Sequence, residues 1–303
     1  MTMNNINPLA CCRLCSRECG VDRTNGELGF CRSSDKIFAS RAALHHWEEP
    51  CLSGTKGSGT VFFSSCSLGC VFCQNYEIST GGAGKEISIE RLSEIFLELQ
   101  SQGAHNINLV TPTHFVPQIR EAIILSKKSG LTLPIVYNTG SYDTLETIRS
   151  LEGLIDIYLP DLKYFDDKYA IKYSRAKNYF NTASEAIKEM YRQVGKPSFN
   201  EEGIMTRGII VRHMMLPGLL FDSKKIIDYL YNTYGDSIYI SIMNQYTPTN
   251  QAKEYKEISK PLNNRHYEAL IDYALTIGIT KAFIQEEGTA SESFIPAFDL
   301  RGV

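Results

Sequence analysis

The sequence predicts an α/β fold with a mostly parallel sheet, preceded by a cysteine-rich N-terminal extension. Two observations lead to this prediction. From residue 59 onward, short apolar runs typical of strands alternate with segments of helical periodicity, which is the pattern of βαβ units. In addition, all nine cysteines of the 303-residue chain lie within its first 73 residues. We therefore expect a metal-binding extension over residues 1–57 and a barrel-like domain over residues 58–303.

Composition and charge narrow the class of protein. The net charge of −3 gives no electrostatic argument for binding nucleic acid or a membrane surface. No apolar run reaches the roughly 18 residues that a transmembrane helix needs, and the N-terminus lacks the basic and apolar parts of a signal peptide. We therefore expect a cytoplasmic protein. In a large chain without an export signal, an odd number of clustered cysteines favours metal ligation over disulfides.

Four cysteines of the extension have the spacing of metal ligands. They form the pattern C-x2-C-x3-C-x11-C at Cys12, Cys15, Cys19 and Cys31. Four thiolates at such spacings can close a tetrahedral site, and both zinc and a second iron–sulfur cluster are compatible with them. Cys11 can replace Cys12 as a ligand by a shift of register. The alternative to a metal site is a cysteine-rich arm whose thiols are reduced and bind no metal. Cys51 has no near partner, and we expect it to be a small buried apolar residue.

The elements of the barrel-like domain follow from its alternating pattern. The strand candidates are Gly59–Ser64, Asn106–Val110, Pro134–Asn138, Ile155–Leu159, Gly208–Met214, Ser237–Ile242 and Lys281–Ile284. The helix candidates are Ile89–Leu99, Val116–Ser126, Asp143–Ser150, Ser184–Val194, Ser223–Tyr231 and Asn264–Ile277. Residues 162–205 contain no strand candidate, and we expect a long helical insertion there. Loops that carry functional residues should follow the carboxyl ends of the parallel strands.

The loop directly after the first strand candidate holds three further cysteines. Cys66, Cys70 and Cys73 have the spacing C-x3-C-x2-C, and Gly69 allows the loop to fold closely. Three thiolates can bind one iron–sulfur cluster and leave one iron open to an outside group. The alternatives are three buried structural cysteines or part of a zinc knuckle.

This spacing and its strand context resemble the radical S-adenosylmethionine (SAM) superfamily. Within it, the chain is similar to uncharacterised relatives of the pyruvate formate-lyase activating enzymes, which share the run Glu48–Thr60. The resemblance implies a partial (βα)6 barrel with a [4Fe-4S] cluster on Cys66, Cys70 and Cys73, whose open iron is chelated by SAM. In that superfamily, reduction of the cluster cleaves SAM to methionine and a 5'-deoxyadenosyl radical, which abstracts hydrogen from a substrate. An electron donor such as flavodoxin or ferredoxin is the implied partner.

The resemblance also implies cofactor contacts in the loops. Phe72, inside the cysteine loop, is implied as a contact on the adenine side of SAM. Many superfamily members have a Gly-Gly-Glu motif after the second strand that binds the SAM ammonium; here Thr111 and His114 lie in its place and offer hydroxyl or imidazole acceptors. His114 can equally be an ordinary hydrogen-bonded loop histidine. Asn138 and Thr139 end the third strand candidate and can hydrogen-bond the ribose or the carboxylate of SAM.

Charged residues follow the next two strands. Asp161 and Lys163 resemble the Asp-Leu-Lys motif of the activating enzymes, where the aspartate is associated with a cation near SAM. We expect both to be catalytic, and an exposed loop pair is the alternative. Arg212 lies in a run similar to the Arg-His-x-x-x-Pro-Gly signature of those enzymes, and its guanidinium can bind the SAM carboxylate. His213 would point to the opposite face of the strand, so we expect it to be structural.

Two classes of function remain open at this point. The first class is a radical SAM enzyme. Its nearest named activity is installation of a glycyl radical on a partner enzyme, and a different protein or a small molecule is the competing substrate. The second class is an iron–sulfur or zinc protein with an electron-transfer or binding role and no SAM chemistry. It predicts no SAM cleavage after reduction and no role for Arg212.

Overall fold

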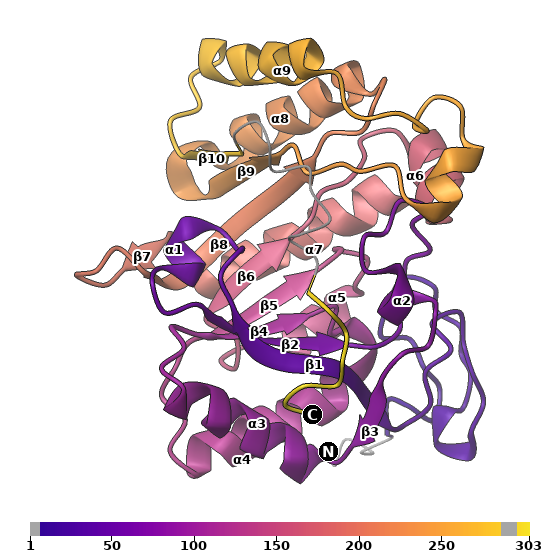
Figure 1. Ribbon diagram of the computed structural model, residues 1–303, viewed down its shortest axis with the longest axis vertical. Coiled ribbons are helices and arrows are strands. Elements are labelled where there is room, and N and C mark those ends of the chain that lie inside the picture. The colour runs from indigo at the N-terminus through magenta and orange to yellow at the C-terminus, as the bar shows by residue number, and fades with distance from the viewer. Residues whose placement is uncertain (1–6, 286–295) are drawn as a thin grey trace, which may run out of the picture.

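The computed structural model describes residues 7–285 and 296–303. Over these residues, one sheet runs through the molecule in the strand order β10-β9-β8-β6-β5-β4-β2-β1-β3, with β7 paired to β8 (Figure 1). Glu286, which would extend the last strand candidate, lies outside the described residues. No helix in the described part of the chain has both the length and the apolarity that crossing a membrane requires.

The centre of the sheet is parallel, as the alternating pattern predicts. Its parallel strands are β2 (Ser58–Phe63), β4 (Ile107–Val110), β5 (Ile135–Thr139), β6 (Ile157–Pro160), β8 (Met205–Met214), β9 (Tyr239–Met243) and β10 (Ala282–Ile284). Every residue of β2, β4, β5 and β6 is buried, because both faces of a parallel sheet are covered. The predicted α/β class is confirmed.

Two antiparallel strands extend the sheet beyond β2. β1 (Ile37–His45) pairs with β2 through partners such as Ala42 and Val61, and β3 (Lys85–Ile87) pairs with β1. β1 lies inside residues 1–57, which we assigned to the extension, so the sheet begins 20 or so residues earlier than the expected boundary. The alanines of β1 favour helix over strand and obscure it in the sequence.

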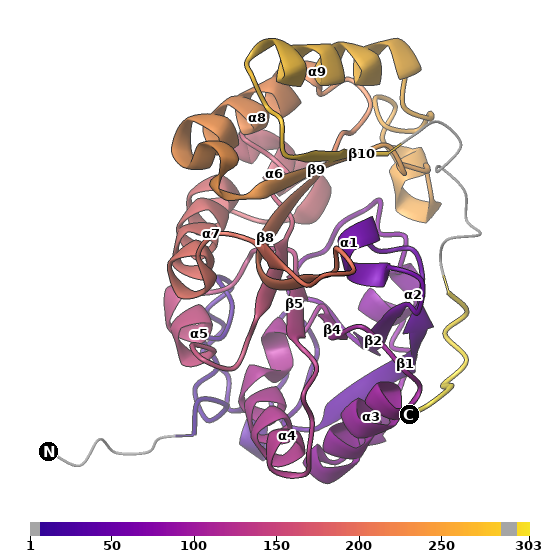
Figure 2. The same ribbon diagram turned by 90° about the vertical axis from the view of Figure 1, so that its left-hand side faces the viewer.

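Helices cover the convex side of the curved sheet (Figure 2). They are α3 (Ile89–Ser101), α4 (Val116–Lys128), α5 (Leu145–Ser150), α7 (Tyr179–Val194), α8 (Leu220–Tyr234) and α9 (Asn264–Thr276). α3 begins where the Ser88 side chain accepts a hydrogen bond from the Arg91 N–H, and it buries Leu92, Ile95 and Phe96 on the face that the sequence predicts.

A short helix, α1 (Pro50–Ser53), lies on the concave side of the sheet (Figure 2). Asn106, which immediately precedes β4, donates a hydrogen bond to the Leu52 carbonyl at 2.8 Å, so α1 lies at the amino ends of the strands. Cys51 and Leu52 pack there in a cluster that also contains Val136, Ile157, Leu159, Met205 and Ile210. α1 therefore fills the barrel at its amino end and leaves the carboxyl end for a site, and Cys51 is the small buried apolar residue that we expected.

Residues 162–205 are mainly helical, as expected. α6 (Asp167–Ser174) precedes α7, which is the crossover helix between β6 and β8. The expectation that this segment contains no strand is wrong, because β7 (Ser198–Phe199) pairs with the beginning of β8. The end of α6 approaches the cysteine loop that precedes α2 (Tyr76–Ser79).

Candidate active site

A cavity of about 610 Å³ opens at the carboxyl ends of the parallel strands. Its size is typical of a site for a small organic ligand. Cys66, Cys70 and Cys73 line one side of it. The residues that line it from the strand ends include Thr111, Asn138, Thr139, Asp161, Lys163 and Arg212. The parallel sheet thus brings these residues into one cavity from five segments of the chain.

The cysteine loop is held in place by backbone hydrogen bonds to the end of α6. The Gly69 N–H donates to the Ser174 carbonyl at 3.2 Å, and the Val71 N–H donates to the Tyr173 carbonyl at 2.8 Å. A side chain at Gly69 would meet Phe30 at 3.2 Å, so the close approach of the loop to its neighbours favours glycine. The loop is therefore fixed by contacts far away in the sequence as well as by its own turn.

Each thiol of the loop has a hydrogen-bonding neighbour. The Leu68 N–H donates to Cys66 Sγ at 3.3 Å, and the Ser79 hydroxyl donates to Cys73 Sγ at 3.3 Å. Cys70 Sγ lies 2.9 Å from the Ser174 hydroxyl. Hydrogen bonds to ligand sulfurs are among the features that set the reduction potential of an iron–sulfur cluster.

Without a bound metal, the electrostatics of the loop favour protonated thiols over thiolates. Burial raises the pKa of the Cys66, Cys70 and Cys73 thiols, so without a metal they stay protonated. Among the described residues, no three cysteine, histidine, aspartate or glutamate side chains converge as ligands of a single metal ion. A [4Fe-4S] cluster does not require such convergence, because each thiolate binds a different iron. Three thiols facing one cavity therefore fit a cluster with one open iron.

Arg212 lies at the centre of a charged network opposite the cysteines. Its Nε donates to Asp161 Oδ1 at 2.9 Å and its Nη2 donates to Asn138 Oδ1 at 2.6 Å. Lys163 Nζ donates to the second oxygen, Asp161 Oδ2, at 2.6 Å. Burial opposes ionisation of Asp161, but Arg212 and Lys163 outweigh it and lower the pKa of the carboxyl group. Asp161 is therefore ionised, and each of its carboxylate oxygens accepts a hydrogen bond from a cationic side chain, Arg212 or Lys163.

The sequence analysis did not identify Glu48 and Glu49 as site residues. Glu48 Oε2 lies 3.3 Å from Arg212 Nη1, and Glu48 Oε1 accepts a hydrogen bond from Asn108 at 3.0 Å. Glu49 also lines the cavity, and its Oε2 atom is buried without a hydrogen-bond partner among the described residues. Burial raises the pKa of both carboxyl groups against the attraction of Arg212. Two adjacent acids directly before α1, whose residues Cys51, Leu52 and Ser53 are buried, were the available signal.

The structure places His114 away from the expected cofactor contact. Pro112 is followed by a 3-10 turn over Thr113–Phe115, in which successive side chains point in different directions. Thr113 lines the cavity, whereas His114 is buried outside the cavity lining and its Nε2 lies 2.7 Å from the Ser64 carbonyl. His114 thus supports the backbone just before the cysteine loop, which corrects our expectation of a contact with SAM.

The remaining expected residues lie near the cavity. Phe72 lines it and packs against Tyr246 with ring centroids 6.2 Å apart. Thr111 and Thr139 line it as well, although the Thr139 hydroxyl donates to Asp143 at 2.7 Å. His213 points away, as expected, and is buried between the Leu162 carbonyl and the Ser223 hydroxyl.

The four cysteines of the extension lie close to one another. Burial, with a smaller contribution from the neighbouring thiols of Cys31, Cys12 and Cys19, raises the pKa of Cys15 to about 12. The Phe30 N–H donates to Cys19 Sγ at 3.4 Å. The described residues do not form a group that would hold a single metal ion, so metal binding here stays a prediction from the spacing.

Sequence comparisons identify relatives of the chain. The profile described as Radical SAM superfamily matches residues 60–230. An uncharacterized protein of Methanocaldococcus jannaschii is 30% identical over 273 residues, an alignment that covers 87% of this chain and 74% of that protein.

Solved structures resemble the chain at low sequence identity. HydG, a maturase of the [FeFe]-hydrogenase, matches with a TM-score of 0.50 and 12% identity over 76% of this chain and 52% of that one. Streptococcus suis SuiB bound to S-adenosylmethionine matches with a TM-score of 0.48 and 14% identity over 74% of this chain and 48% of that one. The chain spans about half the length of these two structures, and the likeness to HydG concerns the fold alone.

Proposed function

Because the chain belongs to the radical SAM superfamily, we propose that Cys66, Cys70 and Cys73 hold a [4Fe-4S] cluster and that the adjoining cavity binds SAM. When bound, the two cofactors supply a 5'-deoxyadenosyl radical that abstracts hydrogen from a substrate. One observation carries the proposal: the three thiols and the Arg212 network line the same cavity of about 610 Å³. Three cysteines without such a cavity would be equally compatible with a structural site.

Arg212 is positioned to bind an anionic group in this cavity. A guanidinium has five N–H donors, and Asp161, Glu48 and Asn138 use three of them. Two donors remain for a ligand, and a carboxylate such as that of SAM is a matching acceptor. Burial disfavours the charged form of Arg212, but the carboxyl groups of Asp161, Glu49 and Glu48 outweigh it and raise the pKa, so the guanidinium is charged before any ligand arrives. Its orientation is also fixed in advance, which lowers the entropic cost of binding.

Lys163 and Asp161 form a second polar feature of the wall. Burial disfavours the charged form of Lys163, but Asp161 outweighs this and raises the pKa of the ammonium group. One of the three ammonium donors binds Asp161, and the other two are available to a ligand. We propose that Lys163 orients a substrate or SAM oxygen near the cysteine loop, while Asp161 holds both Lys163 and Arg212 in position.

The finer activity that we propose is installation of a glycyl radical on a partner enzyme. It is supported by the runs Asp161–Lys163 and Arg212–Gly218, which resemble those of the activating enzymes, and by the place of both runs at one cavity. The electron would come from a low-potential carrier such as flavodoxin or ferredoxin. A second metal, zinc or another iron–sulfur cluster, at Cys12, Cys15, Cys19 and Cys31 is proposed from their spacing and proximity.

The experiment for the cofactors is anaerobic reconstitution with iron and sulfide, followed by electron paramagnetic resonance of the reduced cluster with and without SAM. We expect charge-transfer absorption on reconstitution and a changed spectrum when SAM is added, because SAM occupies the open iron. For the finer activity, the reduced protein is incubated with SAM and a glycyl-radical enzyme, and the radical doublet of glycine is sought. Cluster and SAM binding without that doublet would reject the glycyl-radical activity and leave the cofactor assignment intact.

A further inference from the structure

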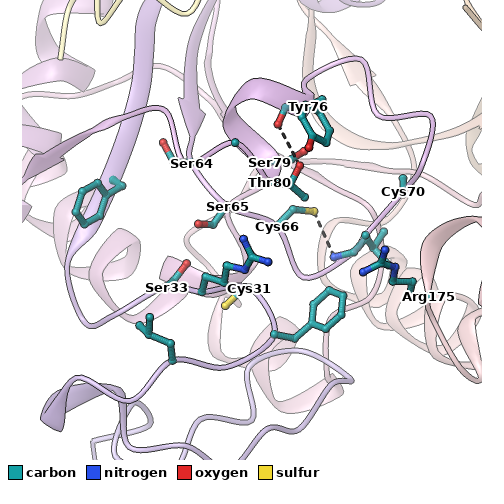
Figure 3. A pocket seen from close by; sticks show the side chains of 18 of the residues that line it. Cys31, Ser33, Ser64, Ser65, Cys66, Cys70, Tyr76, Ser79, Thr80 and Arg175 are labelled. Carbon is teal, nitrogen blue, oxygen red and sulfur yellow. Dashed lines mark hydrogen bonds between the residues drawn. The ribbon is translucent and has the colours of Figure 1, made fainter. Parts of the chain in front are cut away.

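A second cavity, of about 660 Å³, lies behind the cysteine loop (Figure 3). Residues from the N-terminal segment, the loop, the stretch after α2 and the end of α6 line it. Cys66, Leu68 and Cys70 line both cavities, so the loop forms the wall between them. We propose that this second cavity binds a small phosphorylated organic anion, at a site separate from the SAM cavity.

The charges of the second cavity favour an anion. Among the described residues that line it, Arg32 and Arg175 are the charged ones, and none is acidic. Neither guanidinium forms an ion pair or a side-chain hydrogen bond with any described residue, so both are available to a ligand. Figure 3 shows Arg175 at the edge of the cavity. A cation would meet two positive charges and no carboxylate there.

Arg17 fixes the position of this edge. Its guanidinium donates to the carbonyls of Arg175 and Ser174, the latter at 3.3 Å, and lies 3.6 Å from the centre of the Phe30 ring. Its Nε donates to the Ser67 carbonyl at 2.9 Å. The N-terminal segment, the cysteine loop and the end of α6 are thereby joined by hydrogen bonds around the cavity. Its wall is therefore held together by specific contacts.

Ser33 supplies a hydrogen-bond donor without a partner. Its side chain lines the cavity, is only 4% exposed, and its hydroxyl has no hydrogen-bond partner among the described residues (Figure 3). A buried hydroxyl without a partner is energetically costly, and an acceptor oxygen in the cavity would remove that cost. Ser65 also lines the cavity and offers a further hydroxyl.

The combination of donors and apolar surface defines the ligand class. Two guanidiniums and hydroxyl groups suit a tetrahedral oxyanion, which accepts hydrogen bonds from several directions at once. Leu28, Phe30 and Phe38 also line the cavity, so an organic group has apolar contacts as well. A phosphomonoester with an apolar part satisfies both features, whereas inorganic phosphate satisfies only the first.

The test is isothermal titration calorimetry of the reconstituted, cluster-loaded protein in chloride buffer under anaerobic conditions, with phenyl phosphate as the probe. Two comparison ligands are titrated in the same way. Inorganic phosphate lacks the apolar part of the probe, and benzoate has a carboxylate in place of the phosphate. Because Arg32 and Arg175 have φ angles of +58° and +53°, the double substitution uses asparagine, which tolerates this conformation. The matched control is Lys127→Asn with Lys128→Asn at the end of α4, which removes the same charge far from the cavity (Figure 1).

We expect saturable binding of phenyl phosphate that is tighter than that of phosphate or benzoate and is not displaced by SAM. The double arginine substitution should weaken it by at least about tenfold and Ser33→Ala by roughly threefold to tenfold, with no change in the control. Absence of saturable binding would overturn the proposal, as would unchanged affinity in both variants. Displacement by SAM would place the probe in the first cavity, and equal or tighter binding of benzoate would reject the phosphate class. Cluster absorption of each variant verifies its fold, and Ser33→Ala keeps the test valid if the double variant fails to fold.

Discussion

Glu48 Oε2 and Arg212 Nη1 lie 3.3 Å apart although 164 positions separate the two residues in the chain. Glu48 comes from the segment before the first parallel strand, and Arg212 lies near the end of β8. The Arg212 side chain is 14% exposed and the Glu48 side chain 9%. The segment that precedes the barrel therefore supplies one of the two carboxylates that hold the central cation of the cavity.

Removing Glu48 should destabilise the protein more than removing an exposed glutamate. Glu48→Ala leaves the Arg212 charge partly unpaired in a buried site, and we expect the free energy of unfolding to fall by roughly 3 kcal/mol. Glu48→Gln retains a hydrogen-bond acceptor and should cost about 1–2 kcal/mol. Urea-induced unfolding at equal cofactor loading measures both. Glu86→Ala, at an exposed position of β3, is the control, and an equal effect of Glu48→Ala and Glu86→Ala would contradict the account.

Arg17 should control the stability of the cysteine loop. Arg17→Ala removes its hydrogen bonds to Ser67, Ser174 and Arg175. The amide protons of Gly69 and Val71, which donate to the end of α6, should then exchange at least about tenfold faster. Hydrogen–deuterium exchange with mass spectrometry measures this. Arg13→Ala, at an exposed neighbouring position, should leave the loop unchanged; slower or equal exchange in the Arg17 variant would show that the contact does not hold the loop.

His213 should make the protein less stable in mild acid. Burial lowers its pKa from 6.5 to about 4, so below pH 6.5 the unfolded chain binds a proton that the folded chain does not. The stabilisation is complete above pH 6.5 and is lost progressively as the pH falls toward 4. Between pH 7 and pH 5 this loss is about 2 kcal/mol. Urea unfolding measures the free energy of unfolding at pH 7 and pH 5. The difference between the two pH values should be smaller by this amount in His213→Gln and unchanged in the control His266→Gln, at an exposed histidine. An equal difference in both variants would contradict the assignment.

Metal analysis tests the cysteines of the extension. A Cys15→Ser and Cys19→Ser double variant should lose the metal of the second site, either one zinc or the iron of one cluster, while the cluster on Cys66, Cys70 and Cys73 remains. Elemental analysis together with cluster absorption measures this. Cys51→Ala, at a cysteine that packs among apolar residues at the amino end of the barrel, is the control. Identical metal content in the double variant and the unchanged protein would establish an extension without metal.

The parallel strands and the residues at their ends were predictable because both depend on local pattern. Asp161 and Arg212 end up 2.9 Å apart since neighbouring parallel strands end at the same edge of the sheet. The cysteine loop was predictable for the same reason, because its spacing is a local feature of the chain directly after a strand.

Features that depend on tertiary contacts were not predictable. Glu48 lines the cavity through contacts with Asn108 and Arg212, which are 60 and 164 positions away in the chain. His114 is turned away by a single 3-10 turn, which leaves no periodic signal in three residues. β1 was missed because its alanines favour a helix in isolation, and its strand conformation comes from pairing with β2.

The most direct test of the central claim is the amount of 5'-deoxyadenosine formed from SAM after anaerobic reconstitution and reduction. The unchanged protein should form it, and Cys70→Ala, which removes one of the three thiols at the cavity, should form none. Arg212→Lys retains the positive charge but loses the bridging geometry, and it should form the product with a raised KM for SAM. Product formation by Cys70→Ala, or none by the fully reconstituted unchanged protein, would contradict the account.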